Sequence, residues 1–78
     1  MRKLKVLIVG AAFSADLHSD GYSRILDKVD IVGICDKHTA AIKTLADRYG
    51  FTGYTAYDDY DKAIAECECD LIDICMPN

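Results

Sequence analysis

The stretch that decides the fold is VLIVGAAFSA, residues 6–15, in which an apolar run ends at Gly10 and small residues follow. A short run rich in β-branched residues predicts a strand buried on both faces of a parallel sheet, over residues 4–9. A glycine after such a strand, with small side chains at the start of a helix, lets backbone N–H groups approach an anion at the helix N-terminus. The stretch therefore predicts a strand, a tight turn and a helix that together can hold a pyrophosphate.

Three later segments have apolar residues at helical spacing. The first, residues 14–28, predicts a helix with an apolar stripe along one side. The residues of this stripe are Leu17, Tyr22, Ile25 and Leu26. Thr39 is placed to cap the second helix, which ends at Gly50, and Asp58 or Asp59 is placed to cap the third.

Apolar runs predict two further strands, at residues 29–35 and at residues 71–76, the latter closed by Pro77. Residues 51–57 contain aromatics, threonines and a glycine, and we interpret them as a short extended connection. Strands that alternate with helices predict an α/β fold with a parallel sheet and right-handed crossovers. The expected order is β-α-β-α-β, a partial Rossmann-type sheet of three strands that becomes three-layered and doubly wound when complete.

Length, charge and hydropathy limit the class of protein. With 78 residues, 51% of them hydrophobic and 28% charged, the chain can form one compact unit. A net charge of −4 offers no extended positive surface, so we expect no nucleic-acid partner. No apolar run approaches the ~20 residues that span a bilayer, so we expect no membrane partner. Residues 1–15 imitate a signal peptide, but cleavage after Ala15 would remove the first strand and the turn.

Four cysteines occur, at positions 35, 67, 69 and 75, and none of them forms a C-x-x-C pair. Cys67 and Cys69 have no second Cys or His pair at a useful spacing, so we expect no metal ligands. Unpaired cysteines of this kind are typical of a reducing compartment, and we expect a cytoplasmic protein with free thiols.

The turn matches part of the dinucleotide fingerprint. Gly10 occupies the position of the first glycine, Ala15 is an accepted substitute for the third, and Ala12 places a methyl group at the second. Asp36 ends the second predicted strand 21 positions after Ala15, close to the ~20 expected for a carboxylate that binds the adenosine ribose. This carboxylate would repel a 2′-phosphate, so the pattern favours NAD, while the adjacent Lys37 keeps NADP possible.

Alternatives remain open at this point. A glycine after a strand also serves tight packing alone, and Asp36 also suits a helix cap at the end of a strand. An acid after the second strand can bind any ribose, including that of S-adenosylmethionine. His18 and His38 form no nucleophile–base–acid set, so we predict no catalytic residue and treat His18 as a surface or packing residue.

At the level of motifs the chain resembles the Gfo/Idh/MocA oxidoreductases, the relatives of glucose-fructose oxidoreductase and inositol dehydrogenase. The resemblance covers the whole chain. The motifs that carry it are Gly10 to Ala15 followed by His18, Ile34-Cys35-Asp36, Ala46 to Gly50, Tyr57 to Tyr60, and Cys75-Met76-Pro77-Asn78.

The resemblance implies hydride transfer between a nicotinamide cofactor and a sugar, inositol or related polyol. It also implies roles for particular residues. Gly10, Ala12, Phe13, Ser14 and Ala15 would lie at the pyrophosphate; Asp36 and Lys37 at the adenosine ribose; and Met76, Pro77 and Asn78 on the approach to the nicotinamide.

The chain departs from the family pattern in two places. Ala12 replaces the usual second glycine, and the family's Glu-Lys-Pro motif and C-terminal substrate domain are absent from residues 1–78. We therefore expect residues 1–78 to be the N-terminal part of a dinucleotide-binding domain, inactive alone and belonging to a homo-oligomer when complete. The alternative is a non-catalytic module that senses a dinucleotide.

Overall fold

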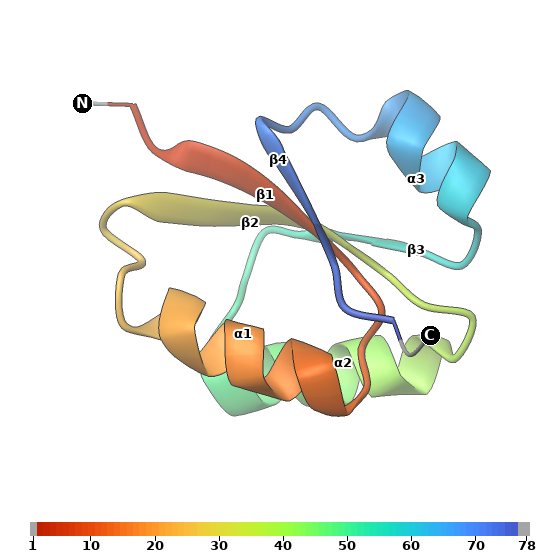
Figure 1. Cartoon of the computed structure of the whole chain (residues 1–78), viewed down its shortest axis with the longest axis horizontal. Coiled ribbons are helices and arrows are strands. Elements are labelled where there is room, and N and C mark those ends of the chain that lie inside the picture. The colour runs from red at the N-terminus through yellow and green to blue at the C-terminus, as the bar shows by residue number, and fades with distance from the viewer. Residues whose placement is uncertain (1, 77–78) are drawn as a thin grey trace.

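A parallel sheet of four strands forms the centre of the computed structural model, which describes residues 2–76 (Figure 1). Strands and helices alternate along the chain. Their bounds are β1 (Leu4–Val9), α1 (Phe13–Ser23), β2 (Val29–Cys35), α2 (Thr39–Tyr49), β3 (Thr55–Tyr57), α3 (Tyr60–Glu66) and β4 (Leu71–Ile74). The predicted α/β class and parallel Rossmann-type sheet are confirmed.

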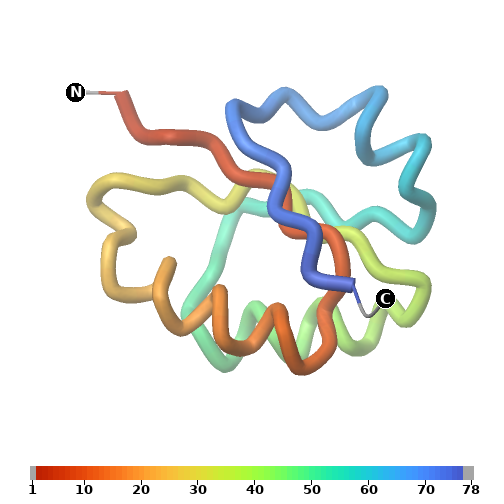
Figure 2. The backbone as a smooth tube through the Cα atoms, viewed as in Figure 1, coloured from red at the N-terminus to blue at the C-terminus, as the bar shows by residue number. Residues whose placement is uncertain are grey.

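The strand order is β3-β2-β1-β4, with every neighbouring pair parallel. Helices α1 and α2 lie against one face of the sheet, and α3 lies on the other (Figure 1). Because β1 stands between β2 and β4, the turn that follows β1 has a strand end on each side. Figure 2 shows the last described residues passing beside this turn.

The prediction of three strands was wrong, because residues 55–57 form a fourth. Strand β3 pairs with β2 through Gly33, Ile34 and Cys35. The backbone N–H of Asp36 then donates to the carbonyl oxygen of Tyr57 at 3.0 Å. Only Tyr57 is buried among the three residues of β3, so the strand has no apolar pattern that would reveal it in the sequence.

Helix α1 ends at Ser23 rather than at Lys28. Beyond it the backbone N–H groups of Arg24 and Ile25 donate to the carbonyls of Gly21 and Tyr22, three residues back, which tightens the chain into turns. The cap predicted for α2 was wrong. Thr39 is the first residue of α2, the N-cap position is His38, and no side chain makes a capping hydrogen bond there.

The C-terminal end of α2 and the N-terminal cap of α3 were predicted correctly. Gly50 follows α2 with φ +73°, the left-handed conformation that glycine adopts without strain. The Asp59 carboxylate accepts hydrogen bonds from the N–H groups of Asp61 and Lys62, at 2.8 and 3.2 Å, and so caps α3.

The apolar stripe predicted for α1 was partly wrong. Leu17 is 62% exposed, whereas Ala15 and Ser19 are fully buried. Tyr22 and Leu26 do pack against the core. Small side chains one helical turn apart let α1 approach the sheet closely, so the helix buries its small residues and leaves Leu17 toward solvent.

Strand β1 is buried on both faces, as predicted. Val6 and Ile8 belong to the core on the side of α1 and α2, which also contains Ile34, Ile42 and Leu45. The alternate residues of β1 belong to a smaller core beneath α3. That core comprises Leu7, Val9, Cys35, Tyr57 and Ala63.

All four cysteines are free thiols. Cys35 and Cys75 are buried, and Cys67 and Cys69 are partly exposed. Among residues 2–76, no helix is both long and apolar enough to cross a membrane.

Replacing Ser19 with alanine should stabilise the fold. The Ser19 hydroxyl is buried and has no hydrogen-bond partner among the described residues. Its removal, together with the higher helix propensity of alanine, should raise the free energy of unfolding by about 1 kcal/mol. Urea denaturation followed by circular dichroism measures the change.

Ser23→Ala in the same helix is the control, because the Ser23 hydroxyl donates to the Asp20 carbonyl at 2.7 Å. It should change stability by less than about 0.5 kcal/mol. If Ser19→Ala lowers the free energy of unfolding, the Ser19 hydroxyl must make a stabilising hydrogen bond, contrary to the structure.

Candidate dinucleotide-binding site

Gly10 occupies a place where only glycine fits. Its φ is +98°, and a Cβ there would lie 2.8 Å from the carbonyl oxygen of Cys75. Its N–H donates to the carbonyl of Cys35 at 2.7 Å, while the Cys75 N–H donates to the carbonyl of Val9 at 2.7 Å. The turn after β1 is thus held between the ends of β2 and β4.

The residues after Gly10 form an uncapped helix N-terminus. Ala12 precedes the helix with φ −99° and ψ −153°, an extended conformation that alanine adopts without strain. No described side chain hydrogen-bonds to the start of α1, and Ala12, Phe13 and Ser14 are exposed. The N–H groups of the first turn are therefore open to an anionic ligand.

Ala15 is fully buried at the third position of the fingerprint. A larger side chain would hold α1 away from the sheet, so alanine performs the packing role of the third glycine. Ala12 and Ala15 thus both suit the backbone that the turn requires.

Asp36 links the two loops at this edge of the sheet. Its Oδ2 accepts a hydrogen bond from the Ala11 N–H at 2.7 Å, and its Oδ1 accepts one from the His38 N–H at 2.8 Å. The carboxylate is 18% exposed, so its oxygens face both the turn and solvent. Asp36 is not the cap of α2, because the cap position is His38. Lys37 is exposed beside it.

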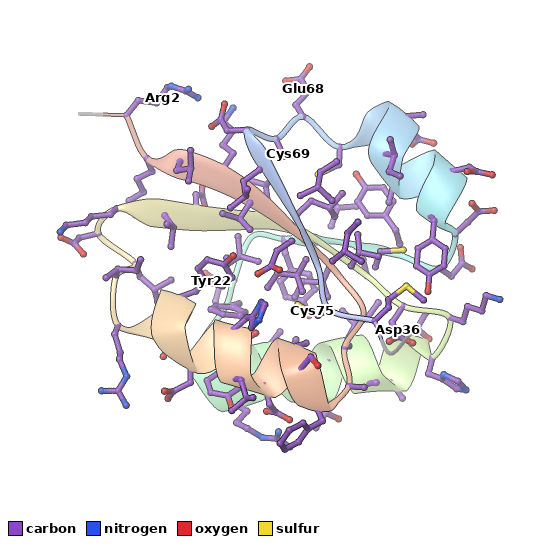
Figure 3. The ribbon with its side chains drawn as sticks, in the orientation of Figure 1. Arg2, Tyr22, Asp36, Glu68, Cys69 and Cys75 are labelled. Atoms are coloured by element: carbon purple, nitrogen blue, oxygen red, sulfur yellow. The ribbon has the colours of Figure 1, made fainter. Side chains whose placement is uncertain are left out.

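Met76 lies on the other side of the turn. Its Cγ is 3.2 Å from the position that a Cβ on Gly10 would take. Figure 3 shows Asp36 and Cys75 at the edge of the sheet where β1, β2 and β4 end. The structure therefore brings together Gly10, Ala12 to Ala15, Asp36, Lys37 and Met76; Pro77 and Asn78 lie outside the described residues.

Asp16 links the start of α1 to α2, a contact that was not predicted from the sequence. Its carboxylate accepts hydrogen bonds from the Arg48 guanidinium and from the Tyr49 hydroxyl, the latter at 2.8 Å. These hydrogen bonds lower the pKa of Asp16. They join the first turn of α1 to the last turn of α2, and so fix the helix N-terminus in front of β1.

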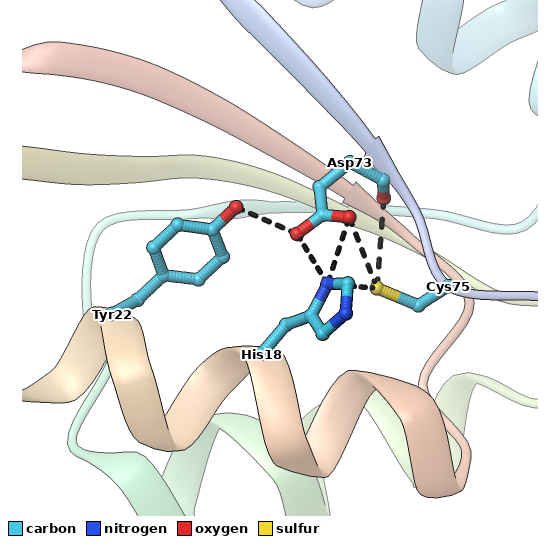
Figure 4. Close-up of polar contacts among 4 residues, drawn as sticks. All are labelled: His18, Tyr22, Asp73 and Cys75. Atoms are coloured by element: carbon cyan, nitrogen blue, oxygen red, sulfur yellow. Dashed lines mark hydrogen bonds and ion pairs between the residues drawn. The ribbon is translucent and has the colours of Figure 1, made fainter.

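A second polar cluster joins α1 to β4 (Figure 4). The Asp73 carboxylate accepts a hydrogen bond from the Tyr22 hydroxyl at 2.6 Å, and its two oxygens lie 2.7 and 2.9 Å from His18 Nδ1. The Cys75 Sγ lies 3.3 Å from His18 Nδ1 and 3.4 Å from Asp73 Oδ1.

The pKa values in this cluster reflect its burial. Burial alone would raise the pKa of Asp73, but hydrogen bonds from Tyr22, His18 and Cys75 outweigh it, and the pKa is lowered. Burial, with the nearby Asp73 charge, raises the pKa of Cys75 to about 12. This cluster was not predicted; the available signal in the sequence was an aspartate inside the apolar run of residues 71–76.

The sheet order, the glycine turn and the acid at the end of β2 define the class of protein: this is a Rossmann-type dinucleotide-binding fold. A family model described as "Oxidoreductase family, NAD-binding Rossmann fold" matches residues 4–78. The chain therefore belongs to the Gfo/Idh/MocA oxidoreductase family, and the match is to that family's NAD-binding Rossmann fold.

Among characterised proteins, D-glucoside 3-dehydrogenase of Escherichia coli K12 is 28% identical over 75 residues, covering 96% of this chain. The chain spans 21% of the length of that relative.

Solved structures show the same fold. WlbA dehydrogenase from Bordetella pertussis, in complex with NADH and UDP-GlcNAcA, matches 99% of this chain and 22% of its own, with a TM-score of 0.83 and 21% identity. Myo-inositol dehydrogenase from Lactobacillus casei, in complex with NAD(H) and myo-inositol, matches 94% of this chain and 21% of its own, with a TM-score of 0.81 and 16% identity.

Gly10→Ala should destabilise the fold and change the backbone conformation of the turn after β1. The positive φ and the overlap with the Cys75 carbonyl together should cost about 2–5 kcal/mol. Chemical denaturation measures this loss. The matched control is Gly21→Ala, because nothing lies within 4 Å of a Cβ at Gly21, in the last turn of α1.

The control should be stabilised, by about 0.5–1 kcal/mol, because alanine is the better helix former. Equal effects of the two substitutions would contradict the tight fit at Gly10.

Proposed function

We propose that this chain is the N-terminal part of a dinucleotide-binding domain in a longer enzyme. The enzyme transfers a hydride between NAD and a sugar, inositol or related polyol. The single observation that carries the proposal is the Asp36 carboxylate, 2.7 Å from the Ala11 N–H and at the same edge as the uncapped helix N-terminus. Pyrophosphate and ribose sites are thereby adjacent, as a dinucleotide requires.

The pyrophosphate would bind at the first turn of α1, between Gly10 and Ala15. Three features support this position. The N–H groups there have no side-chain cap, the helix dipole favours an anion, and Ala12 leaves the backbone exposed. The methyl group of Ala12 would narrow the space in front of the N-terminus of α1, so the pyrophosphate would lie against the N–H groups of Phe13 and Ser14.

The adenosine ribose would bind at Asp36. The ribose hydroxyl groups would donate to the carboxylate oxygens, each of which already accepts one backbone hydrogen bond. The carboxylate charge repels the 2′-phosphate of NADP, so NAD is the preferred cofactor. Lys37 is close enough in sequence to pair with such a phosphate once the acid is removed.

Met76, Pro77 and Asn78 would line the approach to the nicotinamide. The position of Met76 beside Gly10 supports this, since the nicotinamide half of a cofactor whose pyrophosphate lies at the turn would pass close to the end of β4. The residues that move the proton and bind the sugar or polyol would belong to further parts of the enzyme. The protein would act as a homo-oligomer in the cytoplasm, whose reducing conditions suit its four free thiols.

The titration of the purified protein with NADH, followed by cofactor fluorescence, tests this function. Asp36→Ala removes charge-assisted hydrogen bonds to the ribose, so we expect the dissociation constant for NADH to rise roughly 10–100-fold. The same variant should lose its discrimination against NADPH, because the repulsion of the 2′-phosphate disappears.

Asp30→Ala is the matched control, since Asp30 is an exposed acid at the opposite end of the same strand. It should leave both affinities unchanged. An absence of NADH binding by the unmodified protein, or equal binding by Asp36→Ala, would refute the proposed cofactor site.

A further inference from the structure

Three metal-ligating atoms converge between α1 and the end of β4, on residues that are not among the proposed cofactor contacts. His18 Nδ1, a carboxylate oxygen of Asp73 and the Cys75 Sγ all lie within 4.8 Å of one another. We propose that these three residues form a binding site for a divalent cation, with Zn²⁺ as the ion whose ligand preference they match. An imidazole, a thiolate and a carboxylate are the three ligand types that zinc uses in proteins.

The distances suit tetrahedral coordination after a small adjustment. Zinc bonds of about 2.0–2.3 Å at tetrahedral angles separate neighbouring ligand atoms by about 3.3–3.7 Å. The Cys75 Sγ already lies 3.3 Å from His18 Nδ1 and 3.4 Å from Asp73 Oδ1. The imidazole and the carboxylate, 2.7–2.9 Å apart, would have to separate by about 0.5 Å.

That adjustment is available because His18 is the exposed partner. Its side chain is 47% exposed on α1, whereas the Asp73 side chain is only 14% exposed and Cys75 is buried. A cation would therefore enter from the His18 side and meet two ligands held by the sheet, Asp73 in β4 and Cys75 just after it, whose N–H donates to the Val9 carbonyl. Three protein ligands leave a fourth position for water, since the site is open on that side.

Tyr22 orients the carboxylate in the manner of an outer-shell group. Its hydroxyl donates to Asp73 Oδ2 at 2.6 Å, which leaves Oδ1 directed toward Cys75 (Figure 4). Such hydrogen bonds fix the direction of a ligand's lone pairs and raise metal affinity. When the cation binds, the Cys75 thiol gives its proton to solvent and the thiolate takes the coordinating position.

The competing interpretation is a hydrogen-bonded cluster that only ties α1 to β4. The two interpretations differ in one measurable property, a bond from the Cys75 sulfur to an added metal. Neither depends on dinucleotide binding, so the test is independent of the proposed function.

Titration of the purified protein with Co²⁺ under reducing conditions measures that bond, because thiolate ligation produces a charge-transfer absorption in the near ultraviolet. We expect this absorption to saturate, together with the visible bands of tetrahedral cobalt, and to be displaced by Zn²⁺. Cys75→Ser should abolish the charge-transfer band. His18→Ala should weaken binding at least about tenfold, and Tyr22→Phe by about tenfold with the band retained.

The matched control is the double variant Cys67→Ser, Cys69→Ser, whose thiols pack against the core beneath α3 on the other face of the sheet. It should bind cobalt as the unmodified protein does. Circular dichroism checks folding, and the half-exposed His18→Ala variant decides the outcome if Cys75→Ser fails to fold. An absence of the charge-transfer band, a band unaffected by His18→Ala, or its loss in the double control would overturn the proposed site.

Discussion

The close approach of two strand ends at Gly10 is the constraint on which the rest of the structure depends. The Cys75 carbonyl lies where a side chain would begin, and the backbone of Gly10 is hydrogen-bonded to the end of β2. A larger residue would push β4 away from β1. Since β4 carries Asp73 and leads directly to Cys75 and Met76, the placement of these three residues beside the turn follows from this one contact.

Polar side chains then fix α1 relative to the sheet from two directions. Asp16 joins the first turn of α1 to α2. Asp73 in β4 hydrogen-bonds to His18 in the middle of α1 and to Tyr22 in its last turn. Buried small residues bring the helix close to β1, so its N-terminus points at the gap between the strand ends. The same packing that stabilises the fold thus positions the N–H groups available to a ligand.

Much of this arrangement follows from local chemistry and was predictable from the sequence. Gly10, Gly50 and Asp59 each act through their own backbone or a cap a few residues away, and the apolar runs of β1 and β2 are unmistakable. Asp36 was found because the geometry of one βαβ unit fixes its distance from the turn.

The remainder depends on contacts that no local pattern records. Strand β3 has three residues, of which only Tyr57 is buried, so no apolar pattern marks its pairing with β2. The exposure of Leu17 follows from how closely α1 approaches the sheet, which its own sequence period does not reveal. Asp73 meets His18 across 55 positions, so only the folded chain shows that an acid in a strand and a histidine on a helix are partners.

We propose that the turn after β1 and the end of β2 form one dinucleotide site. Amide chemical shifts of the ¹⁵N-labelled protein, recorded during titration with NAD⁺, test it most directly. We expect the largest changes at the amides of Ala11, Phe13, Ser14 and His38. The cofactor would contact the start of α1 and the Asp36 carboxylate, which accepts hydrogen bonds from the Ala11 and His38 amides. Saturable changes confined to residues away from both loops would contradict it.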